Sequence, residues 1–111
     1  MQRRDAVVLD KIISEIDIAL EIIEGVDFKE FDSSEIMKRA LCMTVINIGE
    51  LVKALSDDLR TKNKQVPWRN IAGFRDIAAH KYQTLNMMDV YQTVTEDFIQ
   101  LRKNIKAITE R

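Results

Sequence analysis

Apolar residues recur every three or four positions along most of the chain, which is the pattern of amphipathic helices. The first such stretch predicts a helix from about Asp5 to Glu24, where Gly25 is a natural stop. Residues 26–31 are interpreted as a connector with Phe28 and Phe31 turned inward. The core face of this first helix is expected to contain Leu9, Ile12, Ile13, Ile16, Ala19, Leu20 and Ile23.

A second helix is predicted from the segment Asp32-Ser33-Ser34 to about Arg60. Any of these three side chains can cap it, and no capping box singles one of them out. Gly49 in its interior costs about 1 kcal/mol relative to alanine, which indicates the close approach of another helix. The main apolar stripe consists of Met37, Leu41, Thr44, Ile48, Leu51, Val52, Leu55 and Leu59.

Residues 61–66 are polar and basic and are expected to form a loop. Pro67 suits the first turn of a third, shorter helix from about Trp68 to His80. The fourth helix is predicted to start after Asn86, a good N-cap, with Asp89 in the first turn, where the helix dipole favours an acid. Its core face is expected to contain Val90, Val94, Phe98, Leu101, Ile105 and Ile108.

These elements predict an all-α protein, an antiparallel four-helix bundle with one shorter helix, formed by a single domain over residues 1–111. Further apolar residues widen the apolar stripe of each of the first two predicted helices beyond one face. Such excess apolar surface favours a homodimer. In the alternative, these residues meet only the chain's own Phe28, Phe31 and Trp68. The residues concerned are Val8, Ile18, Ile22, Ile36, Met43 and Ile46.

Composition narrows the class of protein further. The chain has 111 residues, of which 46% are hydrophobic. It contains no run of about 18 apolar residues, so no membrane-spanning helix is expected. Its first residues lack the uninterrupted apolar stretch of a signal peptide. The one cysteine, Cys42, cannot form an internal disulfide, and we therefore interpret the chain as cytoplasmic.

The net charge of −1 argues against a protein that coats nucleic acid by bulk charge. The charge is unevenly distributed, however. Residues 60–81 contain six basic residues and one acid, a local charge of +5, which leaves −6 for the remainder. This segment can provide a local phosphate site, for which Arg69 and Lys81 are the candidate RNA contacts. It can equally be a solvated loop with ordinary surface cations, because charge runs are a weak signal.

The sequence contains few residues suited to catalysis. One histidine and one cysteine cannot form a zinc site, and no glycine-rich phosphate loop occurs, so no metal or cofactor is expected. The remaining candidates are Arg75, His80 and Tyr82. On a regular helix the side chains of Arg75 and His80 point about 140° apart. A departure from the helix near His80, together with the long arginine side chain, would let both reach one cleft. In the alternative interpretation, His80 only complements the helix dipole and Arg75 pairs with an acid such as Asp76.

The pattern Arg75-x4-His80-x-Tyr82 resembles that of the HepT-like toxins, a branch of the HEPN superfamily of ribonucleases. Two further segments also resemble this family. One leads up to Arg75 and contains Pro-Trp and Ile-Ala-Gly, and the other is Asn-Ile-Gly-Glu in the second predicted helix. The resemblance covers nearly the whole chain, and its combination of motifs is far more specific than Arg-x4-His alone. The matching stretches are residues 28–31, 47–50, 66–75 and 93–97.

The resemblance implies a HEPN bundle that dimerises and a metal-independent endoribonuclease, with catalytic Arg75 and His80 of both protomers lining a shared cleft. It also implies that the protein is the toxin of a toxin–antitoxin pair. The antitoxin would be a minimal nucleotidyltransferase that attaches AMP to Tyr82 and silences the toxin. The physics agrees with this role, because imidazole suits proton transfer near neutral pH and guanidinium is matched to phosphate oxygens. RNA supplies its own nucleophile, the 2′-hydroxyl.

Two departures from the family pattern concern the surroundings of the motif. Asp76 stands where many relatives have Asn, and its charge could weaken RNA binding or hold Arg75 in position. Lys81 and Gln83 stand where Gly and an aromatic residue are frequent, which bears on the efficiency of modification. The leading interpretation is a HepT-type toxin ribonuclease. The runner-up is a catalytically silent HEPN dimer that binds a nucleotidyltransferase, and a third is a bundle in which His80 is only a helix cap.

Overall fold

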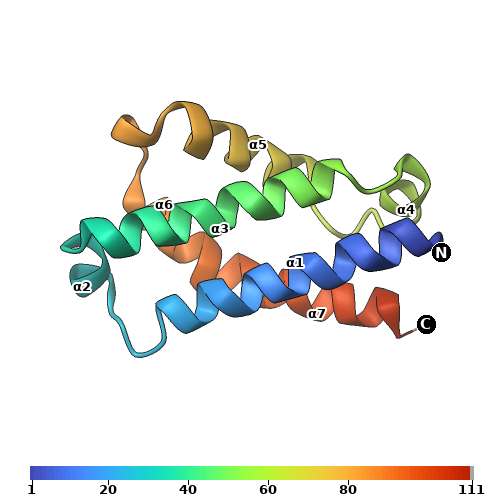
Figure 1. Ribbon diagram of the computed structural model, residues 1–111, viewed down its shortest axis with the longest axis horizontal. Coiled ribbons are helices and arrows are strands. Elements are labelled where there is room, and N and C mark those ends of the chain that lie inside the picture. The colour runs from blue at the N-terminus through green and yellow to red at the C-terminus, as the bar shows by residue number, and fades with distance from the viewer. Residues whose placement is uncertain (111) are drawn as a thin grey trace.

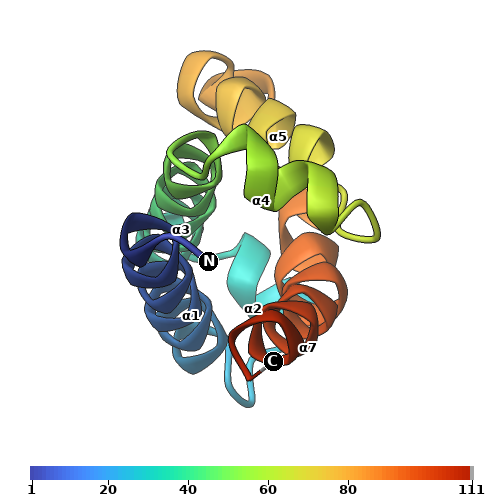
Figure 2. The same ribbon diagram turned by 90° about the vertical axis from the view of Figure 1, so that its right-hand side faces the viewer.

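The computed structural model describes residues 1–110; Arg111, which the expected domain includes, lies outside the described residues. Every regular element within residues 1–110 is helical, which confirms the predicted fold class. The long helices α1, α3 and α5 and the final rod α6–η2–α7 form a bundle (Figures 1 and 2). The elements are α1 (Arg3–Ile22), α2 (Phe28–Asp32), α3 (Glu35–Lys53), α4 (Asp57–Lys62), α5 (Trp68–His80), the 3₁₀ turn η1 (Tyr82–Thr84), α6 (Met87–Gln92), the π-helical segment η2 (Thr93–Asp97) and α7 (Phe98–Thr109).

The helix α3 lies at the centre of the face seen in Figure 1, with α1 on one side and α5 on the other. The chain reverses direction between α1 and α3, since Asp5 near the start of α1 bonds Ser56 just beyond the end of α3. The first helix agrees with the prediction within two residues at each end, and Gly25 ends the turn after it with φ 71°. None of the helices within residues 1–110 combines the length and apolarity that a membrane crossing requires.

The predicted connector at residues 26–31 was wrong in part, because it contains the short helix α2. The Asp27 carboxylate caps this helix by accepting a hydrogen bond from the backbone N–H of Glu30 at 2.8 Å. Phe31 is fully buried and Phe28 half-buried, as expected. Both rings contact the ring of Tyr91, with 5.6 Å between centroids in each pair. The helix α2 thereby closes one end of the core.

The predicted second helix, extending to about Arg60, was also wrong, because it breaks after Lys53. The buried carboxylate of Asp5 accepts hydrogen bonds from the backbone N–H and the hydroxyl of Ser56, at 2.9 and 2.6 Å. The Ser56 hydroxyl in turn accepts from the N–H of Leu59 and starts α4. Apolar periodicity continues across this break, since Leu55 and Leu59 are both buried, so the pattern alone could not reveal it. At the other end, Ser34 is the cap of α3.

The third helix spans Trp68–His80 as predicted. Pro67 is its N-cap residue and not part of its first turn, and the expected loop at residues 61–66 begins only after Lys62. Asn86 caps the last rod as predicted, accepting hydrogen bonds from two backbone N–H groups. All six predicted core residues of that rod are buried. The π-helical segment Thr93–Asp97 inside it was not predicted.

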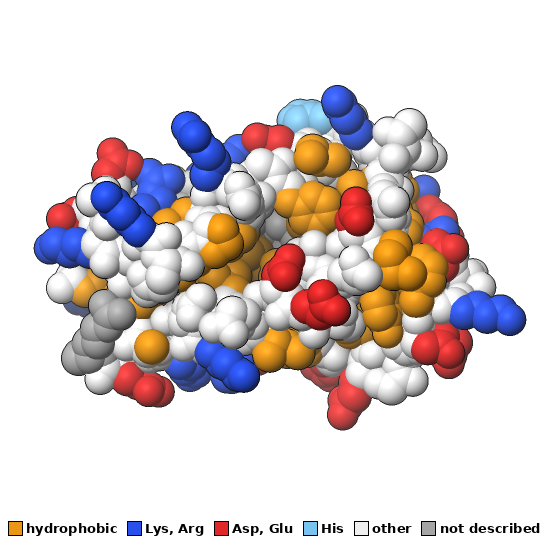
Figure 3. Space-filling view, turned by 180° about the vertical axis from the view of Figure 1, so that it is seen from behind, with side chains coloured by type: hydrophobic (Ala, Val, Ile, Leu, Met, Phe, Trp, Pro, Cys, Tyr) orange, Lys and Arg blue, Asp and Glu red, His pale blue; other side chains and the backbone are white. Residues whose placement is uncertain are grey.

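Several apolar side chains remain exposed on the surface of the described residues. Ile18 on α1 and Ile36 and Met43 on α3 are 48%, 83% and 55% exposed, so the alternative in which they pack against the chain's own aromatic residues is wrong for these three. On the face seen in Figure 3, apolar side chains line a groove of about 380 Å³ between α5 and α7, with Phe74 and Leu101 among them. The bundle therefore leaves apolar surface beyond its own core.

Candidate functional site

The helix α5 and the turn after it carry all the candidate residues of the sequence motif. The helix is regular up to His80, and the backbone first departs from it at Lys81, with φ −131° and ψ 34°. The departure expected near His80 therefore comes one residue later. Consequently Arg75 and His80 start from different faces of α5 and, within residues 1–110, they share no hydrogen bond or ion pair.

Arg75 is fixed against α3 by packing and by charge. A Cβ atom on Gly49 would lie 2.1 Å from the Cβ of Arg75, so only glycine permits this approach, as the sequence suggested. The buried Nε of Arg75 lies 2.5 Å from Oε1 of Glu50, an ion pair without hydrogen-bond alignment. Nη1 donates to Oδ1 of Asp76 at 3.2 Å. The side chain is only 21% exposed, so its position is well defined before any ligand binds.

Asp76 is part of the same network of charges. Its carboxylate accepts a hydrogen bond from Nζ of Lys53 on α3 at 2.8 Å. This bond, followed by that from Arg75, lowers the pKa of Asp76 below its usual value and keeps the group ionised. Glu50 and Asp76 thus face Arg75 and Lys53, two acids against two bases. Arg75 therefore pairs with acids, as the alternative interpretation expected, and the same contacts hold its side chain in position.

His80 is the last residue of α5 and is exposed to solvent (Figure 3). Its side chain makes no hydrogen bond or ion pair with any residue in the described part of the chain. The imidazole is therefore available to a ligand, and its place in the last turn of α5 also suits the helix dipole. The Arg75 guanidinium reaches Asp76, which lies four residues before His80 and so on the same face of α5.

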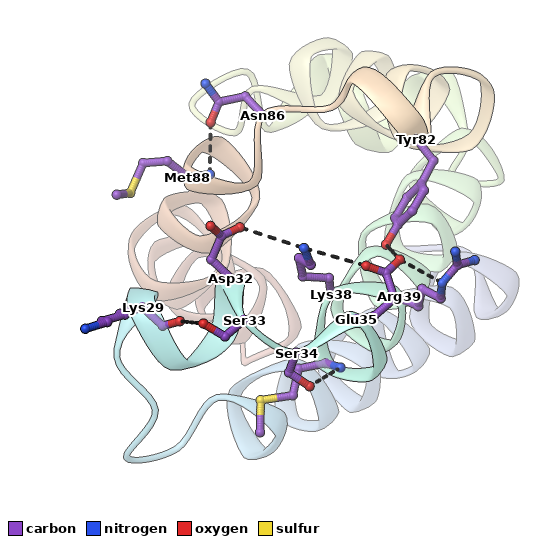
Figure 4. A network of polar contacts seen from close by, with 11 residues as sticks. Lys29, Asp32, Ser33, Ser34, Glu35, Lys38, Arg39, Tyr82, Asn86 and Met88 are labelled. Atoms are coloured by element: carbon purple, nitrogen blue, oxygen red, sulfur yellow. Dashed lines mark hydrogen bonds and ion pairs between the residues drawn. The ribbon is translucent and has the colours of Figure 1, made fainter.

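Tyr82 lies in the turn after α5 and reaches back to the start of α3 (Figure 4). Its hydroxyl donates to Oε1 of Glu35 at 3.0 Å, and the guanidinium of Arg39 lies 5.1 Å from the centroid of its ring. Burial and then the Glu35 carboxylate raise the pKa of Tyr82, while the hydrogen bond from Tyr82 lowers that of Glu35. Lys38 and Arg39 also pair with Glu35, at 3.6 and 2.9 Å. The phenol is therefore neutral and surrounded by charge.

Four residues of this site were missed by sequence reasoning as partners: Glu35, Arg39, Glu50 and Lys53. All lie on α3, between 23 and 47 positions from the groups that they contact. Only Glu50 left a signal, because it follows Gly49 in a segment that resembles the family. The candidate RNA contacts Arg69 and Lys81 are both exposed, near the two ends of α5.

Comparison with known proteins decides the family. The family described as "Ribonuclease HepT-like" matches residues 12–108. The chain belongs to the HepT-like ribonuclease family. Its relatives include a protein of Caldanaerobacter subterraneus subsp. tengcongensis that is named as a proposed RNase. It is 32% identical over 103 residues, or 93% of this chain and 92% of the relative.

Two further relatives come from other organisms. One, in Methanocaldococcus jannaschii, is likewise named as a proposed RNase and is 27% identical over 109 residues, 97% of this chain and 100% of the relative. The other, in Thermococcus cleftensis, is named as a probable ribonuclease HepT and is 26% identical over 102 residues, 92% of this chain and 93% of the relative. No solved structure matches the chain.

Proposed function

We propose that this chain is a metal-independent endoribonuclease, with Arg75 and His80 as its catalytic residues. One observation carries the proposal. In a chain of the HepT-like ribonuclease family, a guanidinium fixed by α3 and an imidazole open to solvent stand on one helix. Arginine offers a permanent charge and several donors to phosphate oxygens, and histidine transfers protons near neutral pH.

The reaction needs only these two kinds of group. An imidazole takes the proton from the 2′-hydroxyl of the RNA, and the 2′-oxygen then bonds to the adjacent phosphorus. The bond from phosphorus to the 5′-oxygen breaks, and that oxygen takes a proton from an imidazolium. The products are a 2′,3′-cyclic phosphate and a 5′-hydroxyl end. Arg75 would stabilise the charge that builds on the phosphate oxygens.

A homodimer would supply the second imidazole, since each chain has only one histidine. The exposed apolar residues Ile18, Ile36 and Met43 support an interface on the side of α1 and α3. Arg75 and Tyr82 both contact α3. A second protomer bound on that side would therefore place its own copies of these two residues near them. Adding inactive His80→Ala chains to the wild type, with exchange of subunits, should lower the activity by more than dilution explains, because a mixed dimer keeps only one of the two imidazoles. Activity that falls only in proportion to the fraction of wild-type chains would contradict a shared cleft.

Tyr82 is the proposed site of control. A cognate minimal nucleotidyltransferase would transfer AMP from ATP to Tyr82: the phenol oxygen bonds to the α-phosphorus, the bond from that phosphorus to pyrophosphate breaks, and the phenol proton is lost. The oxygen could then no longer donate to Glu35, and Lys38 and Arg39 would be free to pair with the new phosphate (Figure 4). The added bulk and negative charge, two residues from His80, would exclude the substrate phosphate. This would make the chain the toxin of a cytoplasmic toxin–antitoxin pair.

An RNA cleavage assay tests the function. The purified protein, incubated with RNA in the presence of a metal chelator, should yield fragments that end in a 2′,3′-cyclic phosphate. Intact protein that binds a nucleotidyltransferase but leaves RNA uncut would instead identify a catalytically silent dimer. Intact mass, measured with and without co-expression of a nucleotidyltransferase from a neighbouring gene, should show one added AMP. That increment should be absent in Tyr82→Phe.

A further inference from the structure

An open groove of about 1130 Å³ lies between α4, the loop that follows it and the outer side of α5. These elements meet at the end of the molecule seen in Figure 2. Three lining residues are basic: Arg60, Lys64 and Arg69. Arg60 already pairs with Asp57, whereas Lys64 and Arg69 are exposed and form no hydrogen bond or ion pair within residues 1–110. The groove therefore offers two unpaired positive charges to a ligand.

The lining of the groove ends on α5 at Asp76, and His80 lies one turn further along the same helix. Arg69, Gly73, Asp76 and His80 follow one another at intervals of three or four residues and so share one face of the helix. A Cβ atom on Gly73 would meet nothing within 4 Å, which leaves this face open. The one acid in the row, Asp76, is paired with Lys53 at 2.8 Å. The rise of an α-helix puts His80 roughly 16 Å from Arg69.

We propose that this groove binds the backbone of single-stranded RNA, with phosphates at Lys64 and Arg69, and leads the strand along α5 to His80. The proposal rests on the ribonuclease function and adds the path by which substrate reaches the histidine. Charge alone does not carry it, since exposed lysines such as Lys103 occur elsewhere. It is carried by the groove, its two unpaired cations and their alignment with an exposed imidazole. Phosphate contacts of this kind position a strand without reading its sequence.

The test compares kinetics on a fluorogenic single-stranded oligoribonucleotide over a range of salt concentrations. The double variant Lys64→Gln/Arg69→Gln should raise KM and leave kcat within about twofold, because it weakens binding and not chemistry. Each lost phosphate contact should lower the slope of log affinity against log salt by about 0.7. The control Lys103→Gln/Lys106→Gln removes the same charge from α7 and should match the wild type.

A second pair of variants probes the floor of the groove. Gly73→Glu should raise KM by placing a carboxylate in the path of the phosphates, and Gly73→Gln, of equal length but neutral, should raise it much less. Both residues are good helix formers, so circular dichroism should show folded protein. If wild type cleaves RNA and the groove variants have the KM and salt slope of the α7 control, the groove is not the path and the ribonuclease function stands. If the wild type neither binds nor cleaves RNA, both proposals fail.

Discussion

The contact between α3 and α5 can be tested by adding one methyl group at Gly49. In Gly49→Ala the new Cβ would lie 2.1 Å from the Cβ and 2.7 Å from the Cγ of Arg75. A Cβ atom is fixed to the backbone, so no rotamer change of the arginine relieves the first overlap, and the two helices must separate. Overpacking of this kind costs about 1–3 kcal/mol. Alanine regains about 1 kcal/mol of helix propensity.

We therefore expect Gly49→Ala to lower the free energy of unfolding by up to about 2 kcal/mol, which corresponds to a fall in Tm of up to about 8 °C for a domain of this size. Urea denaturation followed by circular dichroism measures the change. The matched control is Gly73→Ala in α5, where the new Cβ meets nothing within 4 Å. That variant should gain up to about 1 kcal/mol from helix propensity alone. If both variants are stabilised alike, α3 and α5 do not meet as described, and the account of how Arg75 is held is wrong.

Four further predictions concern three groups that are buried or paired: Asp5, Cys42 and Glu35. Asp5→Ala should lower the free energy of unfolding by about 2–3 kcal/mol, because Ser56 loses two hydrogen bonds to a buried carboxylate; an unchanged urea midpoint would contradict this role. Burial raises the pKa of Cys42 to about 11 from 9.0, so iodoacetamide should react with it far more slowly in the folded protein than in urea. The same shift predicts that stability falls as the pH rises from about 9 to 11, and that Cys42→Ala flattens this fall. Glu35→Gln should lower the pKa of Tyr82, read from phenolate absorbance with Tyr82→Phe as the reference, and an unmoved midpoint would show that Glu35 does not affect the phenol.

Helical periodicity predicted most of the fold because most of its elements owe their position to an apolar stripe. The six core residues of the last rod followed from such a stripe, whereas the bounds of α5 followed from the position of Pro67. The break between α3 and α4 did not, because it depends on Asp5, a buried carboxylate 51 residues away from Ser56. The π-helical segment and α2 likewise depend on local hydrogen bonding that leaves the apolar pattern unchanged. The apolar pattern therefore failed mainly to predict hydrogen bonds that start or end a helix.

The candidate site was predicted in its residues but not in its contacts. The motif drew attention to Arg75, His80 and Tyr82, all within eight positions of one another. Their partners Glu35 and Glu50 come from α3, and only folding brings them near. Glycine in a helix interior was the exception, since its energetic cost implied a close neighbour before that neighbour was known. A glycine in a helix interior therefore predicts a closely packed neighbour, whereas a single charged residue does not identify its partner.

The most direct test of the account is the initial rate of RNA cleavage by wild type, Arg75→Ala and His80→Ala. The assay uses one RNA, a metal chelator, and preparations matched for folding by circular dichroism. We expect cleavage by the wild type and a fall in rate of at least about 100-fold in each variant, which is the contribution of a general acid–base residue or of a charge that stabilises the transition state. Rates in both variants equal to that of the wild type would contradict this expectation, because a guanidinium and an imidazole that can be removed without effect are not the groups that cleave RNA.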